Sequence, residues 1–164
     1  MRCFGIILMS AIGLCGTSLP AQEQSRAPAV EGLVGYGPAP QGDDLLLGAG
    51  ILLPVHAQLE LRFLGTRVTS GASSAIQIAG LVQWRPGRRA VSPYLAGGML
   101  WRRVALPAGP TDQTDAELGL LGVAGGEARI GSSARFRVFL EGHGILANGY
   151  GVEAAGGVRV ALGS

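Results

Sequence analysis

Apolar and polar residues alternate along most of the chain after residue 28. The stretch HAQLELRFLGTR (residues 56–67) shows the pattern, with Leu61 and Phe63 on one side of an extended chain and Glu60 and Arg62 on the other. A strand with two such different faces separates two environments. The pattern alone does not say which face meets water, because a soluble barrel is apolar inside and a membrane barrel is apolar outside.

Eight segments follow this alternation and are predicted to be strands. They comprise residues 29–36, 44–53, 56–67, 74–84, 93–105, 116–128, 134–145 and 150–162. The pieces between them carry the Gly, Pro, Asn or Asp residues that turns use. Helices are a poorer interpretation, because glycine pairs such as Gly97 and Gly98 would cost a helix about 1 kcal/mol per glycine. The sixth segment alternates least clearly, and it too is predicted to be a strand.

The first residues have the order of an export signal, with Arg2 before the apolar run FGIILMSAIGLC and small residues leading to a cleavage site after Ala21. We therefore expect a signal peptide over residues 1–21, a short N-terminal segment over 22–28 and one barrel domain over 29–164. An uncleaved membrane anchor and a lipid-modified cysteine are the alternatives.

Composition narrows the class of protein. The chain of 164 residues is 48% hydrophobic and only 15% charged, whereas about 25% is usual in soluble domains. Its 13 basic residues are all arginine, and the net charge of +2 gives no basic footprint for nucleic acid. Beyond residue 21, Gly, Arg, Glu or Pro interrupts every apolar run before it reaches the length of a transmembrane helix. If the chain enters a membrane, it must do so as strands.

The export signal, the eight alternating segments, the short turns and the phrase SPYLAGGML (residues 92–100) together resemble the small OmpA/OmpX-type barrels of bacterial outer membranes. The resemblance implies an all-β fold, an eight-stranded antiparallel up-and-down transmembrane β-barrel. It also implies a location in the outer membrane with both chain ends in the periplasm. The expected partners are membrane lipid and the outer-membrane assembly machinery.

In such a barrel the polar faces of the strands would line a narrow lumen. We predict a charge network there, made of Glu60, Arg62, Arg135, Arg137, Glu141, His143, Glu153 and Arg159. With Glu31 added, four glutamates balance four arginines, and a neutral set suits an interior that side chains just fill. Ordinary surface ion pairs are the alternative interpretation.

Aromatic residues at strand ends mark the expected membrane boundaries. Tyr36 ends the first predicted strand and Tyr150 begins the last, so both would lie at one boundary. Trp84 and Tyr94 would form a second aromatic girdle at the opposite boundary. The arginine pairs at residues 88–89 and 102–103 could meet phosphate headgroups there, or could simply prevent aggregation at strand ends.

Little in the sequence indicates chemistry. His143 lies two residues from Glu141, but we find no serine to complete a catalytic triad, and we expect a hydrogen-bonded lumen residue rather than an enzyme. No cofactor or metal motif is apparent. The predicted role is structural or interactive, with a very narrow conductance left open. A soluble lipocalin-like barrel for an apolar ligand and an outer-membrane lipid-modifying enzyme are the two alternatives.

Overall fold

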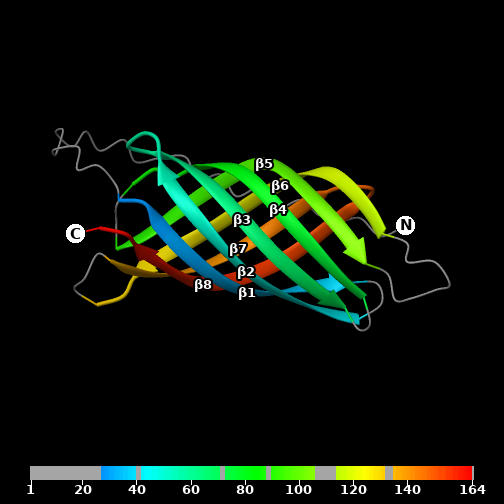
Figure 1. Ribbon diagram of the computed structural model, residues 1–164. Coiled ribbons are helices and arrows are strands. Elements are labelled where there is room, and N and C mark those ends of the chain that lie inside the picture. Colours follow the sequence, from blue (N-terminus) through cyan, green and yellow to red (C-terminus); the bar gives the residue numbers. More distant parts are fainter. Residues whose placement is uncertain are drawn as a thin grey trace, which may run out of the picture.

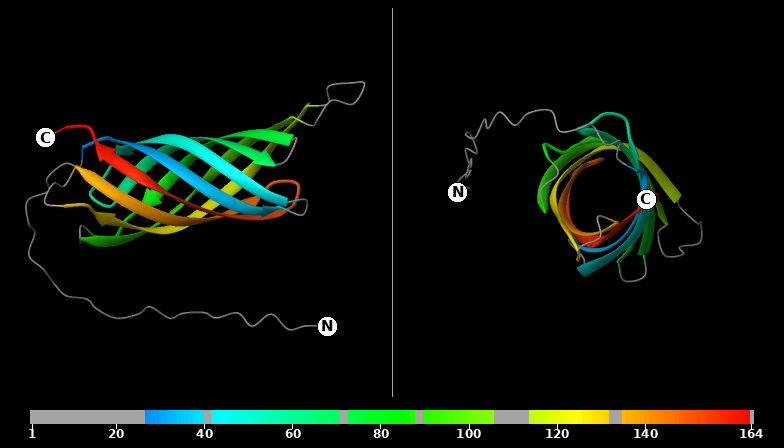
Figure 2. Two further views of the ribbon diagram at one scale, coloured as in Figure 1. Left: turned by 90° about the horizontal axis from the view of Figure 1, so that it is seen from below. Right: turned by 90° about the vertical axis from the view of Figure 1, so that its left-hand side faces the viewer.

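A computed structural model of the protein describes residues 27–39, 42–70, 73–87, 90–105, 114–131 and 135–163. Within these ranges the chain forms a closed barrel of eight strands (Figures 1 and 2). The strands are β1 (Ala29–Ala39), β2 (Gly42–Pro54), β3 (Leu59–Ser70), β4 (Ser73–Trp84), β5 (Val91–Ala105), β6 (Thr114–Arg129), β7 (Phe136–Leu146) and β8 (Tyr150–Ala161). The described residues contain no helix long and apolar enough to cross a membrane.

Each strand pairs antiparallel with the next one along the chain, and β8 pairs with β1 to close the sheet. We call the end where Ala29 pairs with Ala161 the proximal end, and the end where β7 turns into β8 the distal end. That distal turn is tight, and Asn148 adopts the left-handed conformation (φ 42°) that asparagine tolerates well. The predicted all-β, eight-stranded up-and-down architecture is confirmed.

The predicted strand limits differ from the observed ones mainly at turns. β3 begins at Leu59, not His56, because the backbone N–H groups of Val55 and His56 both donate to the Leu59 carbonyl oxygen (3.0 and 3.1 Å) and close a turn there. The sixth segment, which alternates least clearly, is a strand as predicted. The predicted signal peptide lies outside the described residues.

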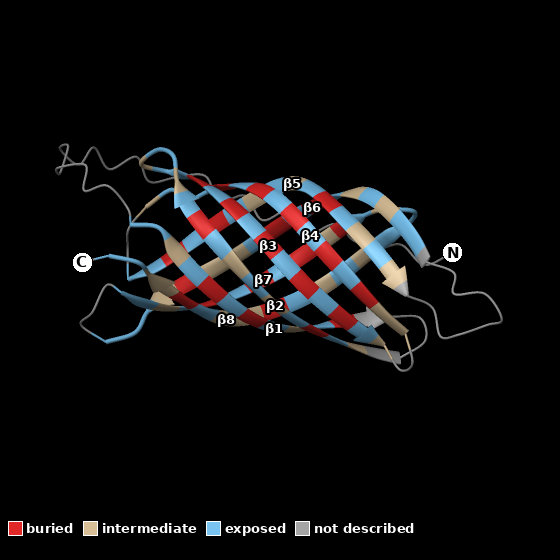
Figure 3. Ribbon diagram, viewed as in Figure 1, coloured by how far each residue is buried: buried red, intermediate tan, exposed pale blue. Residues whose placement is uncertain are grey.

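The two faces of each strand differ sharply in exposure (Figure 3). Along β3 the side chains alternate between exposed and buried, so that Leu61 is 37% exposed and Phe63 47% exposed, whereas Arg62 is 0% exposed. The apolar face therefore points outward and the charged face points into the barrel. This arrangement is the reverse of a soluble barrel.

The interior is divided along the barrel axis. Most charged inward residues lie toward the proximal end of their strands, such as Glu60 and Arg62 on β3, and inward apolar residues such as Val68 predominate toward the distal end. The main members of the buried apolar cluster are Leu33, Leu46, Leu64, Val68, Ala75, Ala79, Leu81, Leu100, Leu121, Val123, Ile145 and Ala155. Charge and hydrocarbon thus fill successive parts of one lumen.

Candidate functional site: a charge network inside the barrel

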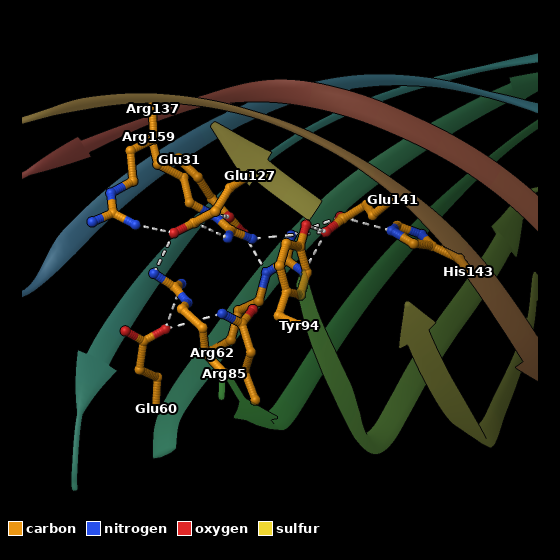
Figure 4. A network of polar contacts seen from close by, with 11 residues as sticks. Glu31, Glu60, Arg62, Arg85, Tyr94, Glu127, Arg137, Glu141, His143 and Arg159 are labelled. Carbon is orange, nitrogen blue, oxygen red and sulfur yellow. Dashed lines mark hydrogen bonds and ion pairs between the residues drawn. The ribbon is translucent and has the colours of Figure 1, made fainter. Parts of the chain in front are cut away.

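Arg62 lies at the centre of the network (Figure 4). Its Nη1 and Nη2 donate to the two carboxylate oxygens of Glu141 at 2.8 and 2.7 Å, which is a bidentate contact from β3 across the lumen to β7. Its Nε donates to Glu31 Oε1 on β1 at 2.6 Å. All three side chains are 0% exposed. The contact therefore joins opposite walls of the barrel in the absence of solvent screening.

Arg159 of β8 occupies the adjoining position. Its Nε donates to Glu31 Oε2 and its Nη1 to Glu127 Oε2, both at 2.8 Å. The guanidinium carbon lies 4.4 Å from the centroid of the Phe139 ring and 4.6 Å from that of the Tyr94 ring. Arg159 is thus held by two carboxylates in its plane and by aromatic faces above it, an arrangement that suits a desolvated guanidinium.

Glu127 of β6 accepts hydrogen bonds from three arginines at the proximal end. Besides Arg159, it accepts hydrogen bonds from Arg137 and from Arg85, the latter at 2.5 Å. Arg85 also donates to Glu60 at 2.8 Å and so extends the network to β3. The arginines and glutamates together form a continuous set across the lumen.

Tyr94 lies inside the barrel, so its predicted place in the outer aromatic girdle is wrong. The ring is 1% exposed, and the hydroxyl donates to Glu141 Oε2 at 2.5 Å. Tyr94 faces Gly125 across the β5–β6 pair, and a Cβ at that glycine would lie 2.8 Å from the ring. Gly125 therefore makes room for the ring.

The error in placing Tyr94 has a simple geometric origin. Trp84 and Tyr94 both have even numbers, but in the observed register Trp84 faces Leu95. Facing residues lie on the same side of a sheet, so odd-numbered residues of β5 share the outward face of Trp84. Tyr94 must then point inward.

His143 connects the network to the distal part of the lumen. Its Nε2 lies 2.8 Å from Glu141 Oε1 and its Nδ1 lies 3.7 Å from Glu153 Oε2. Glu153 accepts a hydrogen bond from Gln77 at 3.5 Å, and Gln77 accepts one from Thr66 at 3.2 Å. A line of polar side chains therefore passes through the otherwise apolar distal half.

Most of the predicted network residues face the lumen and belong to the contacts described above: Glu60, Arg62, Arg137, Glu141, His143, Glu153 and Arg159. Arg135 does not fit the prediction. It is exposed and lies in the turn before β7, because that strand begins at Phe136. The strand start was therefore placed too early for this residue.

Sequence reasoning missed Glu127 and Arg85, which contribute to the network as much as the predicted members do. Glu127 ends the segment whose alternation is obscured by glycines. Arg85 follows the last residue of β4 and was assigned to a loop. Its parity with the inward Gln83 is the signal that could have found it.

Three of the four predicted girdle residues do point outward. Tyr36 is 48% exposed and Tyr150 is 75% exposed toward the distal end, and Trp84 is 44% exposed toward the proximal end. Trp101, which was not predicted, is 36% exposed on the outward face of β5.

The network is electrically balanced. Glu31, Glu60, Glu127 and Glu141 face Arg62, Arg85, Arg137 and Arg159. Every one of these side chains contacts at least one partner of opposite charge, and the contact of Arg62 with Glu141 crosses the lumen from wall to wall. Such a set stabilises one geometry of the barrel and occupies the space through which solutes would pass.

No family model and no curated protein sequence matches the chain. Solved structures with a similar fold include the following three. The N-terminal β-barrel domain of Pseudomonas aeruginosa OprF has a TM-score of 0.72 at 13% identity, covering 84% of this chain and 98% of that one. Neisserial surface protein A (NspA) has a TM-score of 0.62 at 15% identity, with coverage of 84% and 97%. A de novo designed transmembrane β-barrel has a TM-score of 0.58 at 16% identity, with coverage of 85% and 98%.

Proposed function

We propose that this protein is an outer-membrane β-barrel with a structural or interaction role and a lumen closed to all but the smallest ions. The observation that carries the proposal is the inversion of the barrel: Arg62 is 0% exposed inside while Leu61, its neighbour, is 37% exposed outside. Membrane lipid covers the outer face, and the outer-membrane assembly machinery inserts the barrel. An export signal at residues 1–21 delivers the chain to the envelope.

The extent of the outward apolar face supports this proposal. Large apolar side chains are exposed on all eight strands, for example Leu47 (53%), Ile78 (54%), Met99 (62%) and Leu140 (72%). A soluble monomer rarely exposes a contiguous apolar patch beyond a few hundred Å². In a membrane barrel, lipid tails cover such an apolar outer surface.

The soluble lipocalin-like alternative requires the Leu61 face to line an internal cavity. That face is on the outside, so the alternative is wrong for this barrel. For the enzyme alternative, the imidazole of His143 contacts two carboxylates, Glu141 and Glu153, which supports a structural role for it.

Membrane insertion is tested by folding the urea-unfolded protein into phosphatidylcholine vesicles. We expect the protein to float with the vesicles and to migrate differently on a gel before and after boiling, because the closed barrel resists detergent until heated. Protein that remains in the aqueous fraction, with one mobility throughout, would contradict the proposal.

The closed lumen is tested separately in planar bilayers. Because the charge network and the apolar cluster both fill the interior, we expect no large and steady conductance. A wide, water-filled channel in folded wild-type protein would contradict the proposed packing of the lumen while leaving the membrane location intact.

A further inference from the structure

Two arginines stand on the outward face near the distal end of the barrel, next to a face that is mostly apolar. Arg67 of β3 and Arg103 of β5 are both exposed. Each pairs in register with Ile76 of the intervening strand β4, so the three residues form one row across the sheet. With about 4.8 Å between strands, the two arginine Cα atoms lie roughly 10 Å apart.

Each arginine ends the run of outward apolar side chains on its strand. On β3 the outward residues before Arg67 include Leu61 and Phe63, and on β5 those before Arg103 include Met99 and Trp101. This is the depth at which a lipid-facing surface meets headgroups.

The neighbouring charged pair leaves these two arginines available. Arg102 faces inward and lies 3.7 Å from Glu117, so Glu117 of the adjoining strand β6 is already paired inside the barrel. Within the described ranges, no ion pair joins Arg67 or Arg103 to a carboxylate. The arginine pair at 102–103 is thus split, with one residue in the lumen and the other on the outer face.

We propose that Arg67 and Arg103, with Trp101 and Ile76 between and below them, bind the phosphate of a lipid headgroup in the leaflet at the distal end. This inference rests on the proposed membrane location. Guanidinium groups match phosphate oxygens in geometry and charge, and a tryptophan one row toward the bilayer centre anchors at the same interface. Two cations on one row can hold one phosphate from both sides, which a single surface arginine cannot do.

The test uses native mass spectrometry of the full-length protein, folded in detergent and titrated with phosphatidylglycerol. Diacylglycerol serves as the lipid without phosphate. We expect Arg67→Gln and Arg103→Gln each to weaken phosphatidylglycerol binding roughly fivefold, and the double variant about thirtyfold. Arg129→Gln removes an exposed arginine at the proximal end and should change binding less than twofold.

Equal losses in Arg129→Gln and in the double variant would show a general charge effect and overturn the proposal, as would tight binding of diacylglycerol. If inorganic phosphate displaced the lipid at a comparable concentration, the claim that the bound phosphate belongs to a lipid headgroup would be wrong. Every variant is first required to show the heat-dependent gel shift of the folded barrel. A wild-type protein that lacks this shift contradicts the membrane proposal itself, whereas a folded double variant with unchanged lipid binding contradicts only the arginine site.

Discussion

The two halves of the barrel interior are both filled by side chains, but those of the proximal half are mainly charged and those of the distal half mainly apolar. In the proximal half, charged and polar side chains are held by short hydrogen bonds, as Glu127 is by Arg159 and Tyr94 is by its bond to Glu141. In the distal half, Leu100 and Leu121 on the same strands belong to an apolar cluster that fills most of the lumen, beside a line of polar side chains that includes Gln77. A charge network needs every partner, because each lost partner leaves a buried charge, whereas an apolar cluster loses only contacts and volume.

The largest effect is expected in the charged half. Arg62→Met removes a partner that two fully buried carboxylates, Glu31 and Glu141, share, while nearly keeping the side-chain volume. Breaking a buried ion pair from one side costs about 3–5 kcal/mol, so we expect the free energy of unfolding to fall by about 4 kcal/mol. Urea titration of the vesicle-folded protein measures this.

Arg129→Met is the matched control, since the same substitution there removes an exposed charge. We expect it to change the free energy of unfolding by less than about 0.5 kcal/mol. A cost below 1 kcal/mol for Arg62→Met would mean that the carboxylates reach water and that the network is not sealed.

The apolar half should respond somewhat less. Leu100 is 1% exposed within the distal lumen, and Leu100→Ala should cost about 3 kcal/mol because it leaves a cavity in a filled interior. Leu95→Ala on the same strand removes a 55% exposed outward side chain and leaves no cavity, since lipid closes around it. Equal losses for the two variants in a urea titration would argue against a close-packed distal lumen.

The smallest effect concerns the junction between the halves. Tyr94→Phe removes only the hydroxyl that donates to Glu141, a hydrogen bond to a charged acceptor, and should cost about 1.5–2 kcal/mol. Tyr150→Phe, at a side chain that is 75% exposed, should cost close to nothing. If both substitutions are silent by urea titration, Tyr94 does not serve the network.

The fold was predictable because the alternation of apolar and polar residues is visible within the sequence of each strand by itself. Strand limits followed from turn residues, and the closure of β8 onto β1 followed from the even number of strands and the resemblance to known barrels. That Arg62 shares a face with Glu60 was predictable for the same reason, since their strand alternates without a break, and composition together with the resemblance placed that face inside.

Properties that depend on register between strands were not predictable. Tyr94 was assigned to the wrong face because parity cannot be carried from one strand to the next without knowing which residues pair. Glu127 was missed because glycines hide the alternation before it, and Arg85 because it extends the inward face one step beyond its strand. Wall-to-wall contacts such as that of Arg62 with Glu141 depend on strands that are distant in sequence.

The central claim, that the apolar face meets lipid and the charged face lines the lumen, is tested most directly by tryptophan quenching. In full-length protein with Trp84→Phe and Trp101→Phe, a single tryptophan is introduced as Phe63→Trp on the outward face or as Phe139→Trp on the inward face, where the native rings are 47% and 5% exposed. Both variants are folded into vesicles of brominated phosphatidylcholine and checked for the heat-dependent gel shift. The account predicts quenching at position 63 that is several times stronger than at position 139. Equal quenching at the two positions, or stronger quenching at 139, would contradict it.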